Sequence, residues 1–409
     1  MSTKEKLSKF LEIIRQSVNR MKEYNSRNII LLHHNDSDGL ASAAILLKAL
    51  QREKYHVKLF SLEKPYPCVL KKLFTCNSGK IILLADFAGM IASEISSLNN
   101  SKNLVIILDH HKAKEFNDNS IINLNPDFFQ LKGDRDISAS CICYFFAKEL
   151  NTINKDLAHI AAFGAIADFY YIDNKLHSCN KLCLKEGIKT GLIRSEKIND
   201  KEHFFITLGK KEVNILKFYP MIDITGGVAY YNRGSEFGIS IFLNGLTNED
   251  ILKINKLKKI KNHLFRAEIK KLKENKLYNT KNILWFDAKN QFSPMGVKMI
   301  GVFLEEIVNT NNIDPDKYIA GFMHIPDHVP GFGKILHGQT KISIRSSHDL
   351  SLKIRNGKMP GINEFLPAAA KNLGGFADAC HSLSAAATIN AGEENELINE
   401  VQRILDQII

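Results

Sequence analysis

Aliphatic runs alternate with amphipathic segments over about the first 170 residues of the chain. Four of these runs predict buried strands: "NIILLHH" (28–34), "HVKLFSL" (56–62), "KIILLADFA" (80–88) and "NLVIILDHH" (103–111). Apolar residues at helical spacing predict an amphipathic N-terminal helix around residues 7–21 and further helices at 39–52, 91–99, 137–150 and 156–168. Strands that are apolar almost throughout and alternate with helices indicate a parallel sheet covered on both faces.

A second pattern of this kind begins near residue 282. It predicts strands at 282–286, 317–325, 340–347 and 384–391, and helices at 294–308, 362–375 and 394–409. In the stretch 175–250 the pattern is weaker, and we expect a turn-rich connector at 225–236 followed by a strand at 237–245. Residues 251–281 lack Gly and Pro and are rich in Lys, so they predict a long basic helix, either one wall of a groove or a solvated linker.

The predicted fold class is therefore α/β, with two sheet-containing domains. We expect a parallel-sheet domain at residues 1–175, a connector with the long helix at 176–281, and a smaller α/β domain at 282–409, with a cleft between the two domains. A chain of 409 residues is long enough to form two such domains.

Charge and cysteine content narrow the class of protein. The chain has 55 Lys and Arg against 44 Asp and Glu, and this net charge of +11 favours an anionic partner such as nucleic acid, although a lysine-rich proteome produces the same excess. No apolar run approaches the roughly 18 residues of a membrane span, so we expect no membrane partner and a cytoplasmic location. The seven cysteines form no CxxC pair, and the HxCxxxC group at residues 177–183 is either a metal site or a chance spacing.

Acidic and histidine residues gather where three predicted strands end. These residues are His33–Asp38, Asp86 and Asp109–His111. Taken singly, Asp36 or Asp86 is explained equally well as a helix cap or part of a turn. The carboxyl ends of parallel strands share one edge of the sheet, however, and functional crevices lie beyond that edge. We therefore expect these side chains to form one site.

The residue types at this edge point to bound metal ions. His34, Asp36 and Asp38 alternate in an HxDxD pattern, and the set is completed by Asp86, His110 and Asp168. Four carboxylates in one place repel one another unless cations are present. Mixed histidine and carboxylate ligands suit Mn²⁺, Mg²⁺ or Zn²⁺, and the oxygen-rich balance favours Mn²⁺ first and Mg²⁺ next. There are enough ligands for two ions about 3.5–4 Å apart, an arrangement that binds a phosphate oxygen and activates water.

These residues resemble the four motifs of the DHH phosphoesterase superfamily: HxDxDG, the strand-end Asp86, "LDHHK" and Asp168 in its helix. The C-terminal part is similar to the DHH-associated domain, through "SIRS" (343–346) and "GGFADACHSLSAAATI" (374–389). Within the superfamily the chain most resembles archaeal RecJ-like exonucleases. These are related to bacterial RecJ and to the eukaryotic replication factor that joins the replicative helicase and GINS.

The resemblance implies a role for each motif residue. One metal would be held by His34, Asp36 and Asp86, and the other by Asp38, Asp86, His110 and Asp168, with Asp86 bridging the two. His111 would face the scissile phosphate and Asp109 would orient the histidine pair. The implied catalytic residues are Asp36, Asp38, Asp86, His110, His111 and Asp168.

In the C-terminal domain the resemblance implies contacts with the substrate from Arg345, Ser346, Gly374, Gly375 and His381. The chain departs from the family here, because Asp378-Ala379-Cys380 replaces a glycine cluster and Ala387 replaces a glycine. Side chains in place of bare backbone suggest a weakened or altered hold on phosphate. The simpler alternatives are a surface strand position for Arg345 and a helix C-cap for Gly374 and Gly375.

The resemblance thus implies a two-metal exonuclease that degrades single-stranded DNA or RNA from an end, in replication or repair. Two alternatives stay open: a phosphodiesterase for short oligonucleotides, or a scaffold that binds GINS and the helicase without cutting. The altered segment before His381 favours the scaffold, whereas the complete ligand set favours an enzyme. Cleavage polarity, the choice of DNA or RNA and the oligomeric state do not follow from the sequence.

Overall fold

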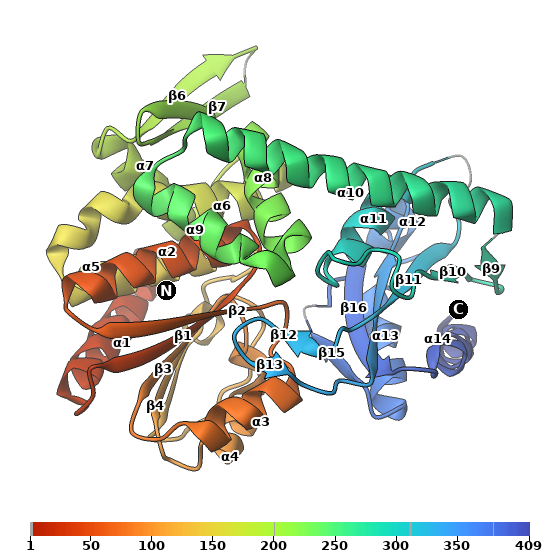
Figure 1. Ribbon diagram of the computed structural model, residues 1–409, viewed down its shortest axis with the longest axis horizontal. Helices are drawn as coiled ribbons and strands as arrows, with labels where there is room; N and C mark the ends of the chain where they lie inside the picture. The colour runs from red at the N-terminus through yellow and green to blue at the C-terminus, as the bar shows by residue number, and fades with distance from the viewer. Residues whose placement is uncertain (1–2, 200, 276, 311–312, 379) are drawn as a thin grey trace. The chain divides into compact units, whose positions relative to one another are not determined.

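The aliphatic runs of the N-terminal half form a five-stranded, wholly parallel sheet, as the computed structural model shows (Figure 1). The structure describes residues 3–199, 201–275, 277–310, 313–378 and 380–409, in two units, Met1–Lys256 and Leu257–Ile409. In the first unit the strand order is β2-β1-β3-β4-β5, with β1 (Asn28–His34), β2 (His56–Leu62), β3 (Ile81–Ala85), β4 (Leu104–Leu108) and β5 (Ile121–Leu124). The predicted parallel sheet is confirmed, and β5 is an additional strand.

Helices cover both faces of this sheet (Figure 1). One face packs in a single core with α1 (Thr3–Glu23), α2 (Ser37–Arg52) and α5 (Ala139–Leu150), and α6 (Ala158–Asp173) packs on α2 and α5. The opposite face is covered by α3 (Pro67–Cys76) and α4 (Ala92–Asn99). Neither face of the sheet meets water, so the β1 side chains that point to one face and those that point to the other are both buried. This explains the unbroken aliphatic run of β1.

The stretch of weak pattern also belongs to the first unit. It contains α7 (Ser178–Lys189), an antiparallel sheet of β6 (Ile193–Ile198), β7 (Lys201–Leu208) and β8 (Lys211–Asn214), then α8 (Ile215–Val228) and α9 (Gly234–Asn244). The strand predicted at 237–245 is wrong, because α9 occupies it. Phe237, Ile239 and Ile241 alternate with small residues and imitate a strand, but the buried positions follow helical spacing. The connector predicted at 225–236 is wrong at its start, which is the last turn of α8.

The second unit has its own six-stranded sheet, with the strand order β15-β16-β14-β11-β10-β9. Its main strands are β10 (Ile283–Asp287), β11 (Tyr318–His324), β14 (Gln339–Arg345) and β16 (Ser384–Asn390), with β9 (Tyr278–Asn279) and β15 (Phe376–Asp378) at the edges. Only β10 and β11 pair in parallel among the described ladders of this sheet. A core joins it to α12 (His348–Arg355), α13 (Ile362–Asn372) and α14 (Glu394–Ile408), and α11 (Met299–Ile307) contacts β11 and β14. The separate C-terminal α/β unit is confirmed.

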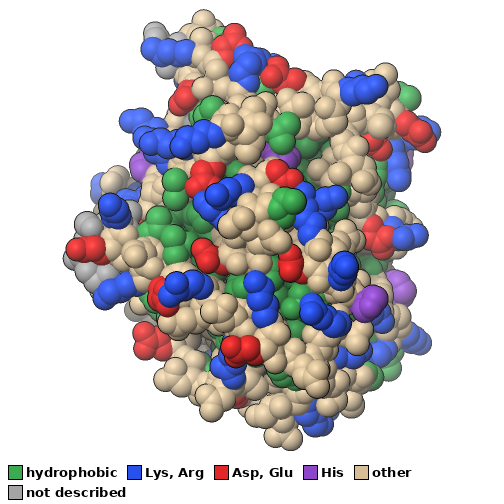
Figure 2. Space-filling view, turned by 90° about the vertical axis from the view of Figure 1, so that its left-hand side faces the viewer, with side chains coloured by type: hydrophobic (Ala, Val, Ile, Leu, Met, Phe, Trp, Pro, Cys, Tyr) green, Lys and Arg blue, Asp and Glu red, His purple; other side chains and the backbone are tan. Residues whose placement is uncertain are grey.

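The predicted basic helix exists as α10 (Asn248–Asn275), but its predicted end at residue 281 is wrong, because β9 (Tyr278–Asn279) lies within that range. Many of its lysines are exposed, among them Lys256, Lys258, Lys259 and Lys270. On the face of the molecule in Figure 2, lysine and arginine side chains are interspersed with acidic ones, so the net positive charge forms no single patch there. The boundaries predicted from sequence at 175 and 281, and the cleft between domains, stay predictions.

Two expectations about composition are addressed by the structure. No helix within the described ranges has both the length and the apolar character needed to cross a bilayer. Cys179 and Cys183 of the HxCxxxC group are buried in the core of the first unit. Neither they nor His177 belongs to a metal-binding arrangement among the described side chains, so the structure favours the chance spacing.

Candidate metal centre

The loop after β1 holds the HxDxD residues in fixed positions. Asp36 is the N-cap of α2: its Oδ1 accepts a hydrogen bond from Gly39 N at 3.0 Å, while its Oδ2 lies 2.7 Å from His34 Nδ1. Asp36 is therefore a helix cap, as the simpler explanation proposed, but only its Oδ1 is used in capping. Its Oδ2 faces His34. Asp38 points from the first turn of α2 to the start of α5, where its Oδ2 accepts from Ala139 N at 2.8 Å.

The helix α8, which the sequence did not reveal, supports this loop from behind. Ser37 donates to Asp223 Oδ1 through both its backbone N (2.8 Å) and its Oγ (2.9 Å), and Asn35 Nδ2 donates to Gly226 O at 3.1 Å. A Cβ on Gly226 would lie 1.8 Å from Asn35 O, so no other residue fits there. The pair of glycines in "ITGGV" was the available signal, since glycines inside an apolar segment mark a close approach of backbones.

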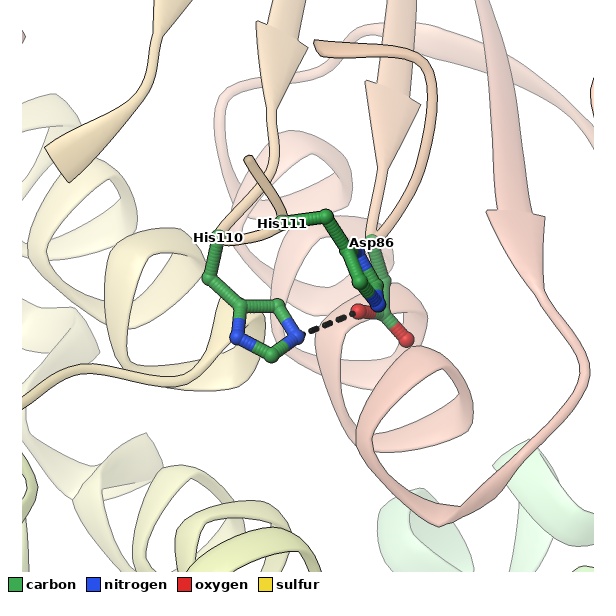
Figure 3. A group of neighbouring side chains, drawn as sticks. All are labelled: Asp86, His110 and His111. Carbon is green, nitrogen blue, oxygen red and sulfur yellow. Dashed lines mark ion pairs between the residues drawn. The ribbon is translucent and has the colours of Figure 1, made fainter. Parts of the chain in front are cut away.

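Asp86 lies at the centre of the arrangement. It follows β3 directly with φ +69°, a conformation that a non-glycine residue adopts only where its surroundings require it. Its two oxygens face different histidines: Oδ2 is 3.6 Å from His34 Nδ1, and Oδ1 is 3.4 Å from His110 Nε2 (Figure 3). This is the orientation that a carboxylate needs to bridge two cations.

The other side of the site comes from β4 and α6. His110 Nδ1 donates to Gly133 O at 2.7 Å, which leaves Nε2 as the ligand atom. That Nε2 lies 3.6 Å from Asp168 Oδ2. Phe169 packs edge-on against the His110 ring with centroids 5.6 Å apart. The predicted acid in an apolar helix thus meets its expected partner.

Asp109 and His111 form a hydrogen-bonded pair, and His111 lies beside Asp86 and His110. Asp109 Oδ1 lies 2.8 Å from His111 Nδ1, and its Oδ2 accepts from Gly89 N at 2.8 Å. Burial on its own would raise the pKa of Asp109, but the His111 charge and these hydrogen bonds lower it to about 2. An ionised Asp109 therefore keeps the Nδ1 proton of His111 in place and leaves His111 Nε2 available.

The six predicted ligands and His111 come together in three overlapping groups. Within each group one candidate ligand atom per residue lies within 4.8 Å of the others; the groups are His34–Asp36–Asp86, Asp38–His110–Asp168 and Asp86–His110–His111. The grouping of Asp86 with both histidines is drawn in Figure 3.

The electrostatics show that this cluster needs positive charge. Burial, with repulsion from Asp86 and Asp168, raises the pKa of Asp38 well above its usual range. Burial also raises the pKa of Asp168 to about 6, against the opposing effect of His110. Burial lowers the pKa of His110, but its hydrogen bond to Asp86 and the surrounding carboxylates outweigh this and raise it. Without metal, protons bound to these side chains thus neutralise part of the negative charge that bound cations would otherwise neutralise.

Because protons and cations compete for these side chains, we expect the stabilisation by Mn²⁺ to increase with pH. Asp168 and His110 have raised pKa values in the folded protein, so their protons stabilise the metal-free fold at low pH, and this contribution disappears as pH rises through those values. Cation binding must displace the same protons. The increase in melting temperature on adding Mn²⁺ should be a few degrees larger at about pH 7.5 than at about pH 5.5.

The quantity to compare is the increase in melting temperature caused by Mn²⁺, because the melting temperature itself also depends on the protonation of His33. Burial lowers the pKa of His33 to about 4, so His33 destabilises the fold as pH falls below its unfolded value of about 6.5. This loss of stability at low pH is opposite in sign to the effect of Asp168 and His110. It is the same with and without Mn²⁺, so it cancels in the increment. An Mn²⁺ increment that is equal at the two pH values would contradict the predicted ligand set.

The substrate residues predicted for the C-terminal domain lie in the second unit. Arg345 ends β14, and its Nε donates to Glu305 Oε1 at 3.0 Å, while Ser346 Oγ donates to Leu383 O at 3.1 Å. Gly374 and Gly375 follow the C-terminal end of α13, and both amides donate to carbonyls of that helix, which is the arrangement of a helix C-cap. His381 is exposed, and Ala379 of the altered segment lies outside the described residues.

Residues 28–165 match the model of the DHH family, N-terminal domain. This part of the chain is therefore a DHH-type domain. A protein of Methanocaldococcus jannaschii without an assigned function is 35% identical over 162 residues, which are 39% of this chain and 36% of that protein.

The fold of the chain is RecJ-like. RecJ of Thermus thermophilus in complex with Mn²⁺ superposes with a TM-score of 0.63 at 15% identity, over 97% of this chain and 55% of RecJ. Cdc45 of Entamoeba histolytica superposes with a TM-score of 0.59 at 12% identity, over 98% of this chain and 99% of Cdc45. The chain thus spans about half the length of that RecJ, and about a third of the M. jannaschii protein is matched.

Proposed function

We propose that this protein is a metal-dependent exonuclease that hydrolyses phosphodiester bonds from an end of single-stranded DNA or RNA. The DHH domain and the RecJ-like fold support a phosphoesterase or nuclease in general. The observation that carries the proposal is Asp86, one of whose oxygens lies near His34 and the other near His110. Nothing in a purely structural role requires a buried carboxylate to hold a strained backbone between two histidine-carboxylate groups.

The residues fit two divalent cations. His34, Asp36 and Asp86 would hold one, and Asp38, Asp86, His110 and Asp168 the other. T. thermophilus RecJ has been solved with Mn²⁺ and with Mg²⁺, which supports either ion here. When bound, the cations would polarise the phosphate and lower the pKa of a water molecule. Among the protein's own groups, Gly133 O fixes the His110 tautomer so that Nε2 faces the ligands.

His111 is the proposed proton donor or hydrogen-bond donor to the phosphate. Its Nδ1 is held by Asp109, its side chain is 31% exposed, and its ring lies 4.3 Å from that of His110, so its Nε2 can reach a substrate beside the ligands. Burial lowers the pKa of His111, but the Asp109 carboxylate outweighs this and raises it. The imidazole is therefore suited to carry a proton near neutral pH.

The second unit would contribute the hold on the nucleic acid. Arg345 presents a planar fork suited to phosphate, but it is paired with Glu305, so phosphate must compete with that carboxylate. The amides of Gly374 and Gly375 are already used within the chain. These contacts favour an altered hold on substrate compared with the one that the family motif implies, with His381 and the exposed lysines of α10 as the remaining candidates.

Two alternatives have specific support. The likeness to Cdc45 over nearly the whole of both chains favours a scaffold, whose proposed partners are GINS and the replicative helicase. The amides of Gly374 and Gly375 already donate hydrogen bonds within the chain. This favours short substrates, which need fewer contacts along a strand. Both alternatives keep the same fold, so activity must distinguish them.

The deciding experiment offers end-labelled single strands of DNA and RNA, both short and long, labelled at either end, with Mn²⁺. We expect Mn²⁺-dependent release of mononucleotides from the long strands, and the labelled end that is lost first reveals the polarity. Cleavage confined to the shortest RNA would instead identify an oligonucleotide phosphodiesterase. No cleavage of any strand, together with binding to GINS, would establish the scaffold.

A further inference from the structure

A second cluster of metal-ligating side chains lies in the second unit, among residues that belong to none of the DHH motifs. Asp287, His324 and Glu394 each offer a ligand atom within 4.8 Å of the others. They come from three elements: Asp287 ends β10, His324 ends β11, and Glu394 begins α14. None of the three is marked by a motif in the sequence.

The strand register explains why these side chains meet. β10 and β11 run parallel, with Asp287 opposite Phe322. His324 lies two residues beyond Phe322, and side chains two apart project from the same face of a sheet. Asp287 and His324 therefore project from the same face at the carboxyl end of this parallel pair. This is where parallel strands present polar groups to ligands.

Glu394 is held over that face by hydrogen bonds. Thr340, opposite His324 on β14, donates its Oγ1 to Glu394 Oε1 at 2.7 Å, and Gly392 N donates to Oε2 at 3.0 Å. Asp287 Oδ1 accepts from Lys289 N at 2.8 Å, which leaves Oδ2 for another ligand. Carboxylates oriented by such contacts are typical of metal ligands, because the contacts reduce the entropy lost on binding.

The cluster carries more negative charge than its histidine neutralises. His324 Nε2 lies 3.9 Å from Glu394 Oε1, which is too far for a hydrogen bond. Glu394 is only 13% exposed in its side chain. A cation held between the imidazole and the two carboxylates would compensate this excess of negative charge.

We propose that Asp287, His324 and Glu394 bind one divalent transition-metal ion, Zn²⁺ or Mn²⁺, separate from the DHH cluster. An imidazole with two carboxylates suits these ions, whereas Mg²⁺ and Ca²⁺ prefer oxygen ligands throughout. Water would occupy the remaining positions. The ion would connect β10, β11 and the first turn of α14, and would thereby anchor the C-terminal helix to the end of the sheet. It has no part in the proposed hydrolysis.

The test measures the number of Zn²⁺ ions bound to the full chain after removal of metals with a chelator. All variants carry Asp86→Asn, which removes the shared ligand of the DHH cluster. Adding His324→Ala should reduce the count by one ion, and adding Glu394→Gln should weaken binding at least about tenfold while keeping an acceptor for Thr340. The matched control is His348→Ala, an exposed histidine of the same unit.

A second measurement separates loss of the site from loss of the fold. Without metal, the His324→Ala and His348→Ala proteins should melt at the same temperature. With Zn²⁺, the His348→Ala protein should be stabilised more, since an ion that binds only the folded state raises its stability. Equal ion counts in the two variants, or an equal Zn²⁺ effect on melting, would overturn the proposal. Activity is not measured, so the outcome is independent of the proposed function.

Discussion

Asp86→Asn is expected to lower the rate of Mn²⁺-dependent hydrolysis at least about 100-fold, because both proposed ions lose a ligand at once. The substitution keeps the size of the side chain and removes only the charge. It also removes a source of repulsion toward Asp38 and Asp168, so the metal-free protein should be at least as stable as the original. Loss of activity with retained stability is the signature of a ligand. The measurements are the cleavage rate and the melting temperature without metal.

The matched control is Asp156→Asn. Asp156 pairs with Arg52 at 2.6 Å on the surface of the same unit and belongs to none of the metal-binding groups among the described residues. This exposed pair contributes little to stability, so the control should keep full activity and Mn²⁺ binding. If Asp86→Asn cleaved as fast as Asp156→Asn, Asp86 would not be the bridging ligand.

Gly226→Ala is expected to damage the metal centre from a residue that touches no ligand. Its Cβ would lie 1.8 Å from Asn35 O, a backbone atom between His34 and Asp36 that cannot move aside without moving them. We expect the free energy of unfolding to fall by about 1–3 kcal/mol and Mn²⁺ affinity to fall about 10–100-fold. Calorimetric titration with Mn²⁺ measures the affinity, and denaturant unfolding measures the stability.

Gly187→Ala provides the comparison for this substitution. Gly187 lies in α7 of the same unit, and the nearest atom to its Cβ would be the flexible Ile193 Cδ1 at 3.1 Å. This variant should change stability less and leave the Mn²⁺ affinity unaltered. If Gly226→Ala also bound Mn²⁺ normally, α8 would be a neighbour of the loop and not its support. Asp223→Asn, which weakens the acceptor for Ser37, would test the same support without a steric clash.

The expected role of α8 changes how the centre is understood. The motif residues supply the ligand atoms, but the backbone that carries His34, Asp36 and Asp38 is positioned by a helix about 190 residues later in the chain, through contacts such as Asn35 with Gly226. Functional geometry commonly depends on such supporting residues as strongly as on the ligands themselves. A chain that kept every motif but lost α8 would, on this account, bind metal poorly.

Much of the fold followed from local sequence. The strands β1, β3 and β4 were predicted because they are buried on both faces and therefore aliphatic almost without interruption. The region of α7 to α9 was not, because Gly, Ser and Thr dilute its helical spacing, and α9 was mistaken for a strand through the alternation of Phe237, Ile239 and Ile241. Local alternation cannot show that a segment packs as a helix when small residues lie between its apolar ones.

The sequence by itself determined that a parallel sheet presents His34, Asp36, Asp38, Asp86 and His110 at one edge, since strand ends in such a sheet share an edge. Only the tertiary structure decided which atoms face one another. Asp86 reaches both histidines because its backbone turns to φ +69°, and Asp38 is anchored by the start of α5. The tertiary structure alone also shows that Asp287, His324 and Glu394 lie together, through the register of β10 and β11 and the position of α14. Distances between side chains depend on how distant segments pack, and local patterns carry no record of that packing.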